Sequence, residues 1–147
     1  MNRYTVTRTI NAPIEDVFKT VADIAEFSKA LPHVVKYEFL SDRHSGVGTR
    51  FRETRLMSGK EEITDLEVTE YAANDRVRIV ADSHGTIWDT MFTVAAENEN
   101  TILTMDMDAK AYKLLPKLMN RLVKGMIIKG VEKDMDFVKS YCEKSEA

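Results

Sequence analysis

A regular series of short alternating segments is the feature that most limits the fold of this 147-residue chain. Between residues 35 and 107, apolar and polar side chains alternate, as in strands with one buried face. Turn-forming stretches such as Ser58–Lys60 and Asp82–Gly85 separate these segments, and their shortness predicts antiparallel hairpins. Together with a strand over residues 4–10, the sequence predicts seven strands.

The alternation also predicts which side chains face the interior of the sheet. Successive side chains of a strand point to opposite faces, so the apolar members of each segment share one face. In this register Asp106 and Asp108 point outward. The expected inner face consists of Tyr37, Phe39, Phe51, Val68, Val77, Ile79, Trp88, Phe92, Val94, Leu103, Met105 and Met107.

Helices are expected at two places. Pro13 and Asp23 are suitable helix-starting residues, and they predict two short helices after the first strand. Apolar residues at helical spacing from Leu114 to Tyr141 predict one long C-terminal helix. One antiparallel sheet with one long helix predicts an α+β fold, in which a strongly curved sheet wraps around that helix. The apolar face of this helix is expected to line a cavity with Leu115, Met119, Leu122 and Met126.

Composition excludes several classes of protein. The net charge of −3 gives no reason to expect nucleic-acid binding, and no apolar stretch is long enough to span a bilayer. The N-terminus has no apolar signal region, and the single Cys142 suits a reducing compartment, so we expect a cytoplasmic protein. The oligomeric state stays open.

Basic residues gather in the last third of the chain. Residues 110–131 contain six bases and no acid. If this region is one helix, five of the bases fall within a narrow arc beside the leucine positions, namely Lys110, Lys113, Lys117, Arg121 and Lys124. Two interpretations stay open: a solvated face that keeps the helix soluble, or peripheral contact with an anionic membrane.

Few residues indicate chemistry. His33, His44 and His84 lack the spacing of metal ligands and are interpreted as turn or edge residues, so we expect neither a metal nor a cofactor. Glu53 and Arg55 are predicted on the inner face. They could pair with each other or hold a polar group of a ligand, unless this strand edge is solvated.

Five motifs resemble, in the same order along the whole chain, those of a known superfamily. They are Ile10–Phe18, Leu31–Lys36, Gly46–Phe51, Val68–Tyr71 and Asp75–Val77. The chain resembles the START-like (SRPBCC) superfamily, and within it the polyketide cyclase/dehydrase-like branch. The resemblance implies a helix-grip fold, with residues 1–147 forming a single START-like ligand-binding domain.

Three functions are compatible with this resemblance. The first is binding, and transport, of a small hydrophobic molecule such as a lipid, an isoprenoid or a polycyclic aromatic compound. The second is a polyketide cyclase/dehydratase-like enzyme, for which no catalytic residue can be assigned, and the third is a protein-interaction or co-chaperone module. For the first, the predicted ligand-binding residues are Tyr37, Phe39, Phe51, Glu53, Arg55, Trp88, Phe92, Leu103, Met105, Met107, Leu115, Met119, Leu122 and Met126.

Overall fold

The computed structural model describes residues 2–145 and confirms the predicted α+β architecture. The elements in chain order are β1 (Asn2–Ile10), α1 (Ile14–Ala22), α2 (Ile24–Ala30), β2 (Val34–Phe39), β3 (Arg50–Met57), β4 (Lys60–Ala72), β5 (Arg76–Ser83), β6 (Thr86–Glu97), β7 (Asn100–Ala111), α3 (Leu114–Leu122) and α4 (Lys124–Ser145). Among these residues no helix is both long and apolar enough to cross a bilayer.

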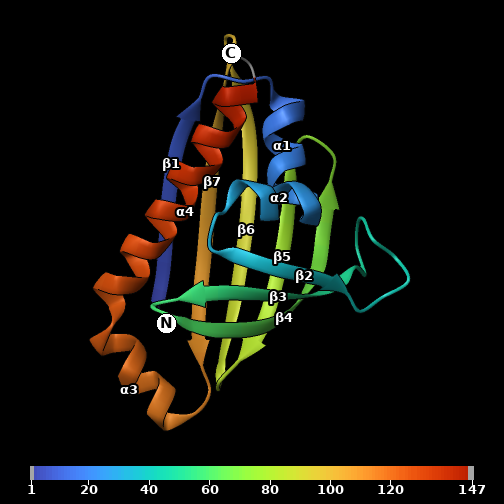
Figure 1. Ribbon diagram of the computed structural model, residues 1–147. Coiled ribbons are helices and arrows are strands. Elements are labelled where there is room, and N and C mark those ends of the chain that lie inside the picture. The colour runs from blue at the N-terminus through green and yellow to red at the C-terminus, as the bar shows by residue number, and fades with distance from the viewer. Residues whose placement is uncertain (1, 146–147) are drawn as a thin grey trace.

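The strands form one antiparallel sheet in the order β1-β7-β6-β5-β4-β3-β2. Figure 1 shows β2 and β3 running across the direction of β5–β7, so the sheet is strongly curved. The long strand β4 pairs with β3 on one side and with β5 on the other. Its register against β5 shifts between Val68 and Glu70. Such a bulge increases the local twist, which helps the sheet to curl.

Burial confirms the predicted register of most strands. Along β7, Leu103, Met105 and Met107 are buried, while Asp106 lies on the other face and accepts a hydrogen bond from Thr5 Oγ1 at 2.6 Å. The buried members of the predicted inner face are Phe51, Val68, Val77, Ile79, Phe92, Val94, Leu103, Met105 and Met107. Trp88 and Phe39 are half-buried against this core.

Tyr37 lies on the predicted face, directly opposite Glu53 of β3, but its side chain is exposed rather than buried. Its strand, β2, is the last in the sheet and shifts register against β3 between Val34 and Lys36. Because β2 has only one neighbouring strand and carries a bulge, strict alternation no longer decides which side chains are covered.

The two short helices form as predicted. Pro13 precedes α1, and Glu15 and Asp16 occupy its first turn, where carboxylates are favoured by the helix dipole. The Asp23 side chain caps α2 by accepting hydrogen bonds from the backbone N–H groups of Ala25 and Glu26. Val17 and Val21 of α1 are buried in the core.

The C-terminal region differs from the predicted single helix. A long helix, α4, is present, but residues 114–122 form a separate helix, α3, and Val123 between them leaves helical geometry at φ −102°, ψ 13°. Figure 1 shows α4 beside β1 and α3 turned away at one end of the sheet. Apolar periodicity continues through the break, so the sequence pattern did not reveal it.

Candidate ligand-binding site

A cluster of charged side chains around Arg55 lies on the inner side of the curved sheet. Phe51, Glu53 and Arg55 alternate on β3, and Glu53 is only 5% exposed. Arg55 Nε donates to Glu53 Oε1 at 2.5 Å, and Arg55 Nη1 donates to Asp134 Oδ2 of α4 at 2.9 Å. Of the interpretations that the sequence left open, pairing between Glu53 and Arg55 is therefore confirmed, whereas a contact with ligand stays a prediction.

The fourth member of the cluster is His33, from the segment between α2 and β2. Its Nε2 lies 3.0 Å from Arg55 Nη1 and 3.3 Å from Asp134 Oδ1, and its ring lies 6.2 Å from that of Phe137. Burial lowers the pKa of His33, and the positive charge of Arg55 adds to this effect against the opposing charge of Asp134. A neutral imidazole can accept the hydrogen bond from Arg55.

Arg55 holds the cluster together electrostatically. Burial alone would lower the pKa of its guanidinium, but Glu53 and Asp134 outweigh burial and raise that pKa. Among residues 2–145, Arg55 Nη2 forms no hydrogen bond, although Nε and Nη1 are both engaged. The side chain of Arg55 is 26% exposed, so one donor edge of an oriented guanidinium remains open to a further acceptor.

Tyr4 is a second polar group on the inner face, and the sequence interpretation did not single it out. It lies on β1 opposite Met107 of β7 and is 4% exposed. Its hydroxyl has no hydrogen-bond partner within the described chain, and burial raises the pKa of that hydroxyl. In the structure Tyr4, Val6 and Ile10 form the buried side of β1, but no sequence signal reports an unpartnered hydroxyl.

The four residues of the C-terminal helical region that were predicted to line the cavity are not buried. Leu115, Met119, Leu122 and Met126 are all exposed, which corrects the prediction of an inward-facing helical stripe. The reason is the attachment of α3, whose one buried side chain is Asn120. The apolar side of α3 is therefore not the side that packs against the sheet.

The basic stripe is also arranged differently from the expectation. Lys110 belongs to β7 and lies 3.7 Å from Asp108, and Lys113 precedes the first turn of α3. Only Lys117 and Arg121 belong to α3, and Lys124 begins α4 after the break. A single helical arc for all five bases is therefore wrong, although all five side chains are exposed.

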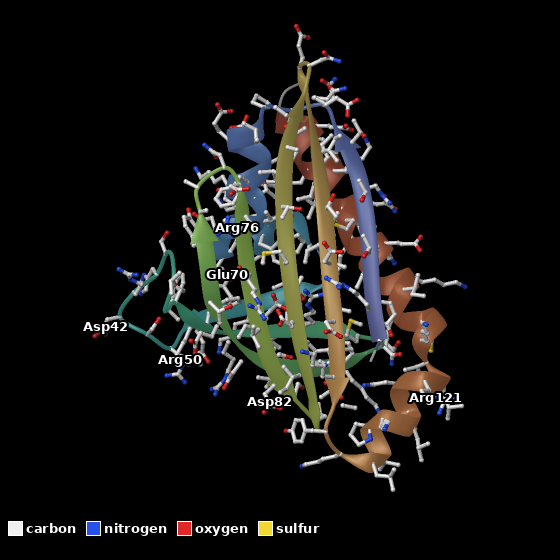
Figure 2. The ribbon with its side chains drawn as sticks, turned by 180° about the vertical axis from the view of Figure 1, so that it is seen from behind. Asp42, Arg50, Glu70, Arg76, Asp82 and Arg121 are labelled. Carbon is white, nitrogen blue, oxygen red and sulfur yellow. The ribbon has the colours of Figure 1, made fainter. Side chains whose placement is uncertain are left out.

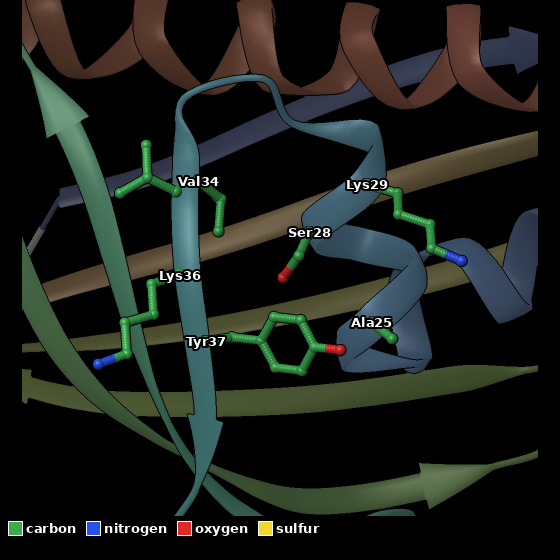
Figure 3. A pocket seen from close by; sticks show the side chains of 7 residues that line it. Ala25, Ser28, Lys29, Val34, Lys36 and Tyr37 are labelled. Atoms are coloured by element: carbon green, nitrogen blue, oxygen red, sulfur yellow. The ribbon is translucent and has the colours of Figure 1, made fainter.

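Two open hollows lie outside the space between the sheet and α4. One, of ≈ 360 Å³, is formed by α2 and β2, and Figure 3 shows the Tyr37 ring reaching from β2 toward Ala25 and Ser28 of α2. The other, of ≈ 500 Å³, lies by the polar side chains Arg52, Asp65 and Asp82. Within residues 2–145, no group of three or more His, Cys, Asp or Glu side chains could hold a metal ion.

Solved structures with the same fold cover nearly the whole chain. The protein TTHA0849 from Thermus thermophilus is 19% identical with a TM-score of 0.80, over 99% of this chain and 100% of that one. A START superfamily protein from Mycobacterium smegmatis is 15% identical with a TM-score of 0.72, over 94% and 97%. The di-domain ARO/CYC protein StfQ of the steffimycin biosynthetic pathway is 11% identical with a TM-score of 0.80, over 98% and 51%.

No curated protein matches the sequence. A family model described as "Polyketide cyclase / dehydrase and lipid transport" matches residues 1–143. This match and the START-like fold confirm the resemblance that the sequence motifs indicated. The chain belongs to the polyketide cyclase/dehydrase and lipid transport family.

Proposed function

We propose that the protein binds a small hydrophobic ligand on the inner side of the curved sheet, with Arg55 holding the ligand's one polar or anionic group. The observation that carries this proposal is the open donor edge of Arg55, whose other nitrogens are fixed by Glu53, His33 and Asp134. A partly buried charged cluster is costly to desolvate, so a role beyond stability is a reasonable explanation for it.

The surroundings of the cluster suit an apolar ligand body. Phe51, Phe92, Met105 and Met107 belong to one apolar core with Trp88 packed at its edge, and methionine side chains adapt to irregular shapes. The unpartnered hydroxyl of Tyr4 offers a second polar contact. The family description supports a lipid or a polyketide-like polycyclic compound as the ligand class, with transport as the use of binding.

A fluorescent fatty acid and its uncharged alcohol analogue test the role of Arg55. Arg55→Gln should weaken fatty-acid binding by about tenfold or more, because a charge-assisted hydrogen bond is lost, and should leave alcohol binding nearly unchanged. Arg78→Gln is the matched control, since Arg78 forms an ion pair with Asp89 on the outer face. Glu53→Gln combined with Arg55→Gln avoids a buried unpaired carboxylate if the single variant folds poorly. Unchanged fatty-acid affinity in both variants would disprove the proposal.

Catalysis is the second candidate, and His33 is the observation that favours it. A half-buried imidazole with a lowered pKa is a suitable general base at neutral pH once a substrate displaces Arg55 from its Nε2. A polyketide cyclase/dehydratase-like activity should then disappear in His33→Asn while fatty-acid affinity persists. Turnover of a polyketide analogue by the wild type and by His33→Asn measures this loss of activity. Equal turnover by the two proteins would show that His33 takes no part in catalysis.

The remaining parts of the proposal concern where the protein works. We propose that residues 1–147 act as one START-like domain in the cytoplasm, consistent with the single cysteine, Cys142, being buried. Ligand exchange would take place at an anionic membrane, and the exposed bases Lys110, Lys113, Lys117, Arg121 and Lys124 support such a contact.

A further inference from the structure

The most unusual surface within residues 2–145 is an apolar face of α3 that no other element of this range covers. This leucine face consists of Leu114, Leu115, Leu118, Leu122 and the neighbouring Met126 of α4. Leu122 is 80% exposed and Leu114 74% exposed. A contiguous exposed apolar patch on a folded chain commonly marks an interaction site.

The attachment of α3 to the sheet explains why its leucines stay outside. Asn120 is buried and donates from Nδ2 to Thr86 Oγ1 at 3.0 Å. Gly85 allows the close approach, because a Cβ atom there would lie 2.9 Å from side-chain atoms of both Lys113 and Pro116. Tyr112 donates from its hydroxyl to Asp82 at 2.7 Å just before the helix. Thus α3 is fixed to the end of the sheet through polar and small groups.

Positive charge borders the leucine face along one edge and at both ends of the helix. Lys117 and Arg121 each lie three residues after a leucine of the face, so they border it on the helix surface. Lys113 and Lys124 flank the two ends of the helix, and residues 110–131 contain no acid. Figure 2 shows Arg121 on α3 at the end of the molecule, apart from the strands.

From this arrangement we propose that α3 docks in the surface of an anionic bilayer, with its leucine face in the acyl boundary and its bases on lipid headgroups. An amphipathic helix with leucines on one side and flanking bases is suited to this position. A second copy of the chain fits less well, since two such faces brought together would oppose bases to bases. Nucleic acid would leave the leucines without a partner.

The docking proposal rests on the proposed function and extends it, because it identifies the place where ligand would be exchanged. Membrane docking can nevertheless be tested independently of the ligand-binding site. Co-sedimentation is measured with phosphatidylcholine vesicles that contain or lack phosphatidylserine, at low salt. The wild type should bind only the anionic vesicles. Lys117→Gln with Arg121→Gln should weaken that binding by about 30-fold, and Leu118→Gln with Leu122→Gln by about tenfold or more.

Matched variants separate docking from general effects. Arg50→Gln with Lys36→Gln removes two exposed bases elsewhere, and Ile63→Gln removes an exposed apolar side chain of β4; both should bind as the wild type does. Arg55→Gln should also retain vesicle binding. A failure of the ligand-binding proposal can therefore be distinguished from a failure of the membrane-docking proposal. The proposal is overturned if neutral and anionic vesicles bind equally, if the leucine and basic variants bind like the wild type, or if ultracentrifugation shows that the leucine face forms a dimer.

Discussion

The two parts of the C-terminal helical region have the same sequence character and opposite surroundings. In α4, Met135, Val138 and Cys142 recur at helical spacing and are buried, with Met135 only 1% exposed. In α3, Leu118 and Leu122 recur with the same regularity and are exposed. Periodicity therefore reports that a helix has an apolar side, but does not determine whether that side meets the body of the protein.

The contacts of each helix account for the difference. Polar bonds at the flanks of α4 hold its apolar side against β1: Arg8 donates to Asp136 at 2.6 Å, and Lys139 donates to the Thr9 carbonyl at 2.8 Å. In α3 the polar bond lies in the centre of the buried side, at Asn120. The position of the anchoring residue relative to the apolar stripe decides which side faces solvent.

The largest expected effect tests this contrast directly. Met135→Ala should lower the free energy of unfolding by about 2–5 kcal/mol, because it leaves a cavity in a packed core. Leu122→Ala should change it by less than about 0.5 kcal/mol, because little area is lost from an exposed side chain. Urea denaturation of both variants measures the difference. A similar loss in the two would mean that α3 buries its leucines in solution.

The next effect concerns the close approach of α3 to the sheet. Gly85 and Gly59 both have positive φ, at +83° and +79°, but an added Cβ meets α3 residues only at Gly85. Gly59→Ala should cost about 1–2 kcal/mol for backbone strain alone. Gly85→Ala should cost more and should also speed hydrogen exchange across α3, whereas exchange in the second half of α4 stays slow. Equal costs for the two variants would argue against tight contact between α3 and the sheet.

Local patterns in the sequence were sufficient for most of the fold. Alternation correctly placed Leu103 and Met105 inward, and the same reasoning found Glu53 and Arg55 because they are two residues apart on one strand. It failed for His33, interpreted as an edge residue, because its partner Asp134 is distant in sequence. It failed for the orientation of α3 for the same reason, since Thr86 and Asn120 are 34 residues apart.

A smaller effect is expected from the anchor itself. Asn120→Ala removes one buried hydrogen bond and leaves the Thr86 hydroxyl unpaired, which should cost about 1–3 kcal/mol. Asn120→Ala combined with Thr86→Val should recover part of that loss, since neither polar group then remains unpaired. Hydrogen exchange should show the change in α3 and not near Met135. Loss confined to the second half of α4 would contradict the role of Asn120 as the anchor of α3.

The smallest effect is a pH dependence at His33, which lies between β3 and α4 and helps to hold them together. Burial holds the pKa of His33 below its usual value of 6.5, with Arg55 and Lys133 acting in the same direction and Asp134 and Glu53 opposing. The unfolded chain therefore takes up a proton at a higher pH than the folded protein does. The stability from neutral His33 is complete above the unfolded value and decreases as the pH falls through 6.5 toward the lower folded pKa. Protonation also removes the lone pair that accepts from Arg55 Nη1, so the contact becomes repulsive.

Replacement of this histidine should remove that part of the pH dependence. His33→Asn should flatten the decline in unfolding free energy between neutral and mildly acidic pH. His84→Asn should not, because the His84 side chain is 82% exposed. Denaturation curves at a series of pH values, with a probe on each helix, measure the effect. Arg55 is bonded to Asp134 of α4, so loosening of Arg55 in acid should reach Met135. The contact between Asn120 and Thr86 should stay intact. A decline of equal slope in His33→Asn would show that another group controls the acid response and that the Arg55 cluster does not hold α4 in place.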